Sequence, residues 1–195
     1  MRTSRTRSWR ALDPGALAAP RAGNSVQPRA RVLGLDPGSR RTGFGIIDCD
    51  GTRTVHVASG AIATPDGDLP RRLQAIFERV RDLVREYQPA EIAIERVFVN
   101  RNPDSALKLG QARGAALCGA FTGAAAVFEY APREIKMAIV GTGAAEKMQV
   151  QHMVKVLLSL EARLGTDESD ALAVALCHAH GRSLRARLGS VSSRT

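Results

Sequence analysis

The order of strand-like and helix-like segments is the feature that most constrains the fold of this chain. Three apolar, strand-like runs come first in series, at residues 31–35, 43–48 and 54–63, and two more follow at residues 91–95 and 126–130. The later runs alternate with helical patterns, which is typical of parallel strands joined by crossovers, whereas strands in series can pair antiparallel. The order therefore predicts an α/β fold whose mixed sheet carries helices on both faces.

Five segments have the pattern of helices. Residues 69–87 place their apolar side chains on one stripe at helical spacing, and residues 103–121, 132–140, 144–160 and 167–180 are further predicted helices. Asn102 can cap the second of these helices, with Pro103 at its first position. The run DCDG at residues 48–51 is a hairpin turn signal between the second and third strands.

Charge is distributed unevenly along the chain. The formal net charge is +9, but residues 1–31 hold seven arginines and one acid, and residues 181–195 hold four arginines and no acid. The stretch between them is nearly balanced. A basic protein often binds nucleic acid, but here the net charge alone does not indicate it, because the excess lies at the two ends.

The two ends also differ from the centre in composition. Residues 1–30 are rich in Arg, Ala, Pro, Gly and Ser, which predicts a disordered basic arm. The alternatives are a transit peptide, or a start codon near Val26 or Val32 that leaves the arm untranslated. Residues 31–181 are the predicted folded domain, and residues 182–195 are a predicted flexible basic tail.

Composition also bears on location. No apolar run approaches the roughly 20 residues of a membrane span, so no membrane association is expected. The three cysteines are widely spaced and odd in number, which does not suggest a disulfide framework. These features predict a protein of the reducing cytoplasm.

Four acidic residues stand where apolar segments meet loops or open a helix. Asp36 ends the first strand-like run and Glu95 ends the fourth, while Asp167 and Asp170 open the last helix on one face, because they are three residues apart. Carboxylates from two strand ends and a helix can converge on one point, where they repel unless a cation lies between them. Oxygen ligands suit Mg²⁺ or Mn²⁺, and a pair of such ions about 3.5–4 Å apart can cleave a phosphodiester.

Each acid also has a simpler interpretation. The loop at residues 36–43 could be a Gly/Pro turn, or a phosphate contact made by Ser39, Arg40, Arg41 and Thr42. Its spacing D-x-G-x-x-x-x-G also occurs in sugar kinases and actin-like ATPases. Glu95 could be a surface acid after a strand. Either Asp167 or Asp170 could be a helix N-cap, which would leave the other unexplained.

Three further residues are candidates for contacts with nucleic acid. Phe98 follows Glu95 closely and could stack on a base, or it could pack in the core at a strand end. Lys136 and Lys147 are expected, from the sequence alone, on solvated helix surfaces. The GTGAAEK run at residues 141–147 lacks P-loop spacing, and the CHAH run at residues 177–180 lacks a second Cys/His pair for zinc.

Taken together, these segments resemble the RuvC family of bacterial Holliday junction resolvases. The matching stretches are LGLDPGSRRTGFGII, IAIERVFVNRNPDSALKLGQARG, REIKMAIVGTGAAEKMQVQHMV and DESDALAVALCHAH. They cover nearly all of residues 31–181, and their order, spacing and residue types are highly specific. The basic ends of the chain lie outside the resemblance.

The resemblance implies a ribonuclease H-like fold with a five-stranded mixed sheet flanked by helices. It implies a homodimer that binds four-way DNA junctions in recombination and repair, and nicks two strands of like polarity symmetrically to leave 5′-phosphate and 3′-hydroxyl ends. The helix at residues 105–121 would lie at the dimer interface. RuvA and RuvB, the branch-migration proteins, are the implied partners.

The resemblance also assigns roles to residues. Asp36, Glu95, Asp167 and Asp170 correspond to catalytic acids that bind Mg²⁺ or Mn²⁺, with two ions in each active site. Phe98 corresponds to an aromatic residue that stacks on a base near the crossover. The remaining two candidates, Lys136 and Lys147, correspond to basic residues needed for DNA binding or cleavage.

Three rival functions are distinguishable in principle. A phosphotransferase with the related actin-like fold would need two such domains and an adenosine pocket, which 195 residues with one acidic set do not favour. A junction-binding protein without catalysis would lack one of the acids. A nuclease of similar fold could act instead on RNA–DNA hybrids or damaged DNA.

Overall fold

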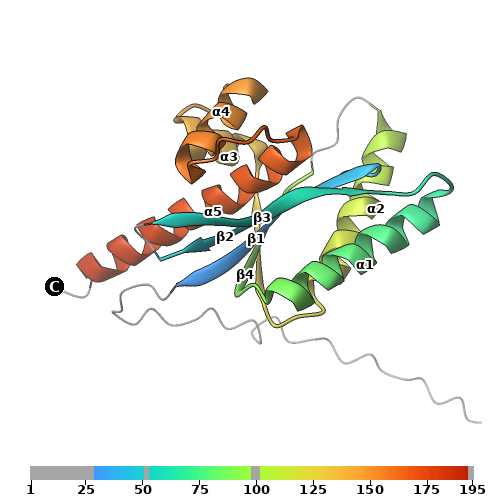
Figure 1. Cartoon of the computed structure of the whole chain (residues 1–195), viewed down its shortest axis with the longest axis horizontal. Helices are drawn as coiled ribbons and strands as arrows, with labels where there is room; N and C mark the ends of the chain where they lie inside the picture. The colour runs from blue at the N-terminus through green and yellow to red at the C-terminus, as the bar shows by residue number, and fades with distance from the viewer. Residues whose placement is uncertain (1–28, 51–52, 98–101, 193–195) are drawn as a thin grey trace, which may run out of the picture.

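A five-stranded mixed sheet forms the centre of the computed structural model, which describes residues 29–50, 53–97 and 102–192 (Figure 1). Its order is β3-β2-β1-β4-β5. The first three strands pair antiparallel, whereas β1 with β4 and β4 with β5 pair parallel. The predicted mixed sheet is therefore confirmed. The strands are β1 (Ala30–Asp36), β2 (Arg41–Cys49), β3 (Thr54–Ala63), β4 (Glu91–Glu95) and β5 (Ala126–Tyr130).

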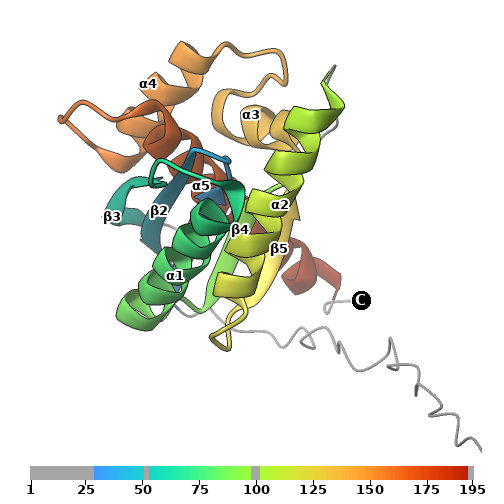
Figure 2. The same ribbon diagram turned by 90° about the vertical axis from the view of Figure 1, so that its right-hand side faces the viewer.

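Helices cover both faces of the sheet. The side packed by α1 and α2 is seen at the front of Figure 2, and α3, α4 and α5 pack on the opposite face. No helix within the described ranges is long and apolar enough to cross a membrane. The helices are α1 (Leu69–Tyr87), α2 (Pro103–Ala120), α3 (Pro132–Val140), α4 (Lys147–Leu158) and α5 (Thr166–Ser192).

Alternation along the strands separates the interior into two cores. In β1, Val32 points to the α5 side, while Leu33 and Leu35 point to the side of α1 and α2, and all three are fully buried. In β4, Ala93 faces α5 between Ile92 and Ile94, which face the other way. Successive strand residues point to opposite faces, so these near-continuous apolar runs require helices on both sides.

Glycines allow α5 to lie unusually close to the sheet. A Cβ placed on Gly34 would lie 2.8 Å from the Ala175 Cβ, and one placed on Gly45 would lie 2.7 Å from the Leu172 Cδ2. Real Cβ atoms do not approach other atoms this closely, so both strands need glycine where the helix crosses them. The start of α5 is thereby held against β1 and β2.

Helix ends follow local capping chemistry. The Asn102 side chain accepts from the backbone N–H of Asp104 at 3.0 Å, which confirms the predicted cap of α2. The structure begins α4 at Lys147, three residues later than predicted, because Gln149 accepts from the Glu146 N–H at 2.8 Å in a capping box.

The last helix is longer than predicted. Instead of ending near His180, α5 continues to Ser192. Residues 182–188 are rich in Arg, Leu and Ala, which favour helix strongly enough to carry it through Gly181. Four predictions fall on residues outside the described ranges: the arm up to residue 28, the tail beyond residue 192, Gly51 of the expected turn, and Phe98.

The CHAH run has a structural role at the amino-terminal end of β4. The fully buried His178 lies with Nε2 2.6 Å from Glu91 Oε2 and with Nδ1 2.7 Å from the Tyr130 hydroxyl. Because a carboxylate only accepts, Nε2–H donates to Glu91. Arg182 donates to the same carboxylate at 3.1 Å. Both ring nitrogens of His178 thus connect α5 to β4 and β5.

Candidate active site

Asp36 and Glu95 lie side by side at one edge of the sheet. Leu35 pairs with Ile94 in the parallel ladder of β1 and β4, and the two acids are the next residue on each strand. Their side chains lie close enough for each to change the pKa of the other. The carboxyl ends of neighbouring parallel strands are a common position for functional groups, and here they bring two carboxyl groups into direct contact.

The first turns of α5 bring the other two acids to this edge. Gly43 pairs with Asp36 across the β1–β2 ladder, and its missing side chain leaves room for the backbone carbonyl of Asp167. Asp170 lies close enough to influence the ionisation of both Asp36 and Glu95. The structure therefore brings together Asp36, Glu95, Asp167 and Asp170.

Two cations contact the helix acids. Arg41 Nε lies 2.6 Å from Asp167 Oδ2, and Lys147 Nζ lies 3.2 Å from Asp170 Oδ2. The positive charge of Lys136, on α3, lowers the pKa of Glu95 and so partly opposes the effect of burial. The structure thus places Lys136 and Lys147 around the acids. The contact of Arg41 was not predicted from the sequence, because it joins residues 126 positions apart.

The acids perturb one another strongly. Burial raises the pKa of Asp36 to about 8, with further increases from Glu95 and Asp170 and an opposing effect of Lys147. Burial also raises the pKa of Glu95. The nearby Asp170 raises the pKa of Lys147, which stays a cation. Near neutral pH, Asp36 therefore holds a proton that a bound cation would replace.

The chemistry of this donor set fits a hard divalent cation, because it consists of four carboxylates. Within the described part of the chain, however, no group of three His, Cys, Asp or Glu side chains has the arrangement of a metal site. Asp167 and Asp170 are instead paired with Arg41 and Lys147. Ligation by all four acids would require these two pairs to open.

Supporting contacts fix the elements that carry the acids. Arg113, on α2, donates from Nε to the Glu95 carbonyl at 3.2 Å. Glu168 accepts from the Ser59 hydroxyl at 2.6 Å and from the Gly165 N–H at 3.0 Å, which joins the start of α5 to β3. The spacing of Gly165 and Glu168 suits half a capping box and could have been noticed, whereas nothing in the sequence indicates the partner of Arg113.

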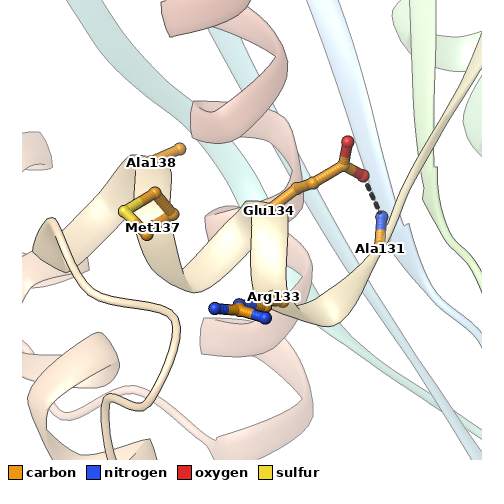
Figure 3. Close-up of a pocket in the computed structure, with 5 residues that line it drawn as sticks. All are labelled: Ala131, Arg133, Glu134, Met137 and Ala138. Carbon is orange, nitrogen blue, oxygen red and sulfur yellow. Dashed lines mark hydrogen bonds between the residues drawn. The ribbon is translucent and has the colours of Figure 1, made fainter.

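A shallow pocket lies on α3 (Figure 3). Its volume is about 540 Å³, and it is lined by Ala131, Arg133, Glu134, Met137 and Ala138. Glu134 accepts from the Ala131 N–H at 2.6 Å and pairs with Arg96, the residue after Glu95, at 3.0 Å. These contacts hold α3, and with it Lys136, beside the end of β4.

The loop after Asp36 differs from expectation at one residue. Thr42 is fully buried, and its hydroxyl donates to the Gly38 carbonyl at 3.1 Å, so it is not available to a phosphate. Arg40 and Arg41 are exposed, and Ser39 is half-buried. Phe98 lies outside the described residues, so its stacking role stays a prediction.

Comparison with known proteins decides the family. The family model described as crossover junction endodeoxyribonuclease RuvC matches residues 32–178. The chain belongs to the RuvC family. A RuvC from Burkholderia pseudomallei strain 668, named crossover junction endodeoxyribonuclease, is 54% identical over 162 residues, which are 83% of this chain and 90% of the relative.

Solved structures agree with this assignment. A structure of Thermus thermophilus RuvC in complex with Holliday junction substrate matches with a TM-score of 0.75 and 32% identity, over 80% of this chain and 97% of the other. The yeast mitochondrial Holliday junction resolvase Ydc2 matches with a TM-score of 0.61 at 11% identity, over 84% and 85% of the two chains. The latter likeness concerns the fold alone, and the ribonuclease H-like fold predicted from the sequence is confirmed.

Proposed function

We propose that this chain is a Holliday junction resolvase, a metal-dependent endonuclease that makes paired, symmetric nicks in strands of like polarity at four-way DNA junctions. The convergence of Asp36, Glu95, Asp167 and Asp170 on one edge of the sheet is the observation that carries the proposal. Membership of the RuvC family supports it, because metal-dependent junction cleavage is that family's activity.

The four acids would hold two Mg²⁺ or Mn²⁺ ions. When bound, such ions supply an activated water and stabilise the leaving 3′ oxygen, so that cleavage leaves 5′-phosphate and 3′-hydroxyl ends. The contribution of the chain begins with the proton on Asp36, which must leave before Asp36 and Glu95 can both act as ligands. Rigid strand ends and α5 then set the spacing between the acids.

Cationic side chains would hold the DNA at this site. Lys147 is 74% exposed at its side chain and already lies 3.2 Å from Asp170, so it can reach a phosphate placed over the acids. There it would stabilise the negative charge that grows on the phosphate oxygens during cleavage. Lys136 is assigned to backbone binding, and Phe98 to stacking on a base near the crossover.

A homodimer would match the symmetry of the junction. Leu107 on α2 and Phe121, the residue after its end, are 62% and 63% exposed, and among the described residues no atom outside the helix's own backbone lies within 4 Å of a Cβ placed on Gly110 or Gly114. At helical spacing these four residues share one face, which suits close packing against a second α2. A two-fold dimer would present two active sites to two strands of like polarity.

The cellular setting follows the family. We assign the chain to the cytoplasm, with RuvA and RuvB as the partners that deliver junctions to it. The three cysteines support a reducing compartment, since all remain free, two of them buried. The basic segments at residues 1–29 and 182–195 would add nonspecific affinity for DNA that weakens with salt.

A nicking assay on a synthetic mobile four-way junction tests the function. The substrates are the junction, a linear duplex and an RNA–DNA hybrid, each with Mg²⁺ or with EDTA, for the wild-type protein and Asp36→Asn. The proposal predicts metal-dependent paired nicks in the junction alone, and their loss in the variant. Cleavage of the hybrid or the duplex instead would contradict the proposed substrate. Tight junction binding without cleavage would indicate a protein that binds junctions without cutting them.

A further inference from the structure

Arg41 makes an ion pair that the family's general mechanism does not explain. It is the first residue of β2, where its backbone pairs with Ala63, and Thr42 beside it is anchored to Gly38. A fixed backbone thus directs its guanidinium to the acids, where Nε lies 2.6 Å from Asp167 Oδ2. Arg41 is 60% exposed and Asp167 33% exposed at their side chains, so the pair is open to exchange with solvent ions.

Every acid of the cluster already has a partner. Asp167 is paired with Arg41 and Asp170 with Lys147, while Asp36 and Glu95 lie next to each other at the ends of paired strands. A divalent ion that takes oxygen ligands must replace these partners one by one. Asp167 and Asp170 are both paired with long, exposed side chains, Arg41 and Lys147, so both partners can be displaced by an ion.

We infer that Arg41 is a counterion that competes with divalent metal ions for Asp167, and that metal binding releases its guanidinium toward the DNA phosphates. The inference rests on the proposed function, because it takes the four acids as metal ligands. Arg41 thereby makes metal binding and DNA binding at this site favour each other.

The chemistry of the guanidinium suits both roles. Arginine presents planar N–H donors that match carboxylate and phosphate oxygens equally well. Once Asp167 ligates a metal ion, Arg41 remains anchored by β2 next to the same site, with Arg40 beside it in the loop. A phosphate bound over the acids is then the nearest anion. Linkage requires that the metal strengthens DNA binding by the same factor as DNA strengthens metal binding.

The expected size of the effect is modest. Exposed ion pairs contribute little free energy, and a metal ion that binds Asp167 must overcome that small contribution. Removing Arg41 should therefore tighten metal binding by about three- to fivefold. Arg40 offers a matched control, because it is also exposed and adjacent, yet within the described residues only its backbone carbonyl takes part in hydrogen bonds, which it accepts from Thr64. Arg40→Ala removes the same charge but leaves the Arg41–Asp167 ion pair intact. It should change the affinity for the metal ion by less than about twofold.

The test measures Mn²⁺ binding to the full chain without DNA, by electron paramagnetic resonance of the free ion. Wild type, Arg41→Ala, Arg40→Ala, Asp167→Asn and the Arg41→Ala/Asp167→Asn double variant are compared, with thermal unfolding as the check on folding. The inference predicts tighter binding in Arg41→Ala alone among the single variants. It also predicts that Arg41→Ala has no effect once Asp167 is replaced.

A second arm measures affinity for a four-way junction with and without Ca²⁺, which takes oxygen ligands as Mg²⁺ does. The strengthening of junction binding by Ca²⁺ should shrink by about three- to fivefold in Arg41→Ala and persist in Arg40→Ala. Equal effects of the two arginine variants, or an Arg41 effect that survives Asp167→Asn, would overturn the inference. Absence of any Mn²⁺ binding in the wild-type protein would instead remove the metal site of the proposed function.

Discussion

Gly43→Ala tests whether close packing of α5 places the catalytic acids. Gly43 pairs with Asp36 in the sheet and faces the start of α5. An added Cβ would lie 2.6 Å from the Asp167 carbonyl carbon, with the carbonyl oxygen closer still, and 3.2 Å from the Ala171 Cβ. Carbon atoms rest at about 3.5–4.0 Å, so the first turn of α5 must move outward by about 1 Å.

Two consequences of this displacement differ in size. Overpacking of this kind costs roughly 1–3 kcal/mol in the free energy of unfolding. A misplacement of about 1 Å can slow catalysis by about 100-fold, and here it would separate Asp167 and Asp170 from Asp36 and Glu95. The affinity for the junction should stay near the wild-type value, because the cationic residues that would hold DNA are not moved.

Single-turnover cleavage, junction binding and thermal unfolding are measured together. Gly60→Ala is the matched control, since its added Cβ would meet the Phe44 ring at 2.9 Å, and a side chain can rotate away where a backbone carbonyl cannot. The control should lose some stability and keep its cleavage rate. Wild-type cleavage by Gly43→Ala, or an equal loss in Gly60→Ala, would refute the reasoning.

Three further predictions concern individual side chains. Because burial raises the pKa of Asp36 to about 8 in the folded protein, its contribution to stability is full below about pH 4 and is lost as the pH rises through about 8; thermal unfolding without metal should show this decline, and an equal decline in Asp36→Asn would contradict it. Phe98→Ala should slow cleavage more than it weakens junction binding, and an unchanged rate would place Phe98 in the core instead. Glu168→Ala removes the acceptor for Ser59 and Gly165, so it should cost about 1 kcal/mol of stability and slow cleavage severalfold; cleavage at the wild-type rate would show that other contacts suffice to fix α5.

The strand ends and the helix start could be predicted because their signals are local. Apolar runs that stop at Asp36 and at Glu95 mark both the strand and the residue that follows its last buried position. The three-residue spacing of Asp167 and Asp170 places both on one helical face without any tertiary knowledge. The cap of α2 at Asn102 is equally local, since the side chain bonds within its own first turn.

Other features depend on contacts between distant segments and could not be predicted. The close approach of α5 needs glycine on β1 and β2, but a glycine in a strand is equally compatible with a turn or a bulge. Arg41 and Thr42 looked equivalent in sequence, yet Arg41 pairs with Asp167 while the Thr42 side chain is buried and donates to the Gly38 carbonyl. Alternation along the strand sends neighbouring side chains to opposite faces, and the tertiary structure decides what each one meets.

The most direct test of the central claim is a comparison of junction binding and junction cleavage in four conservative variants: Asp36→Asn, Glu95→Gln, Asp167→Asn and Asp170→Asn. Asp66→Asn, which changes an exposed acid in the loop before α1, is the control. The account predicts that each of the four variants loses metal-dependent cleavage while binding the junction about as tightly as the wild-type protein, and that the control cleaves normally. Wild-type cleavage by any one of the four would contradict the claim that these acids form a single catalytic site.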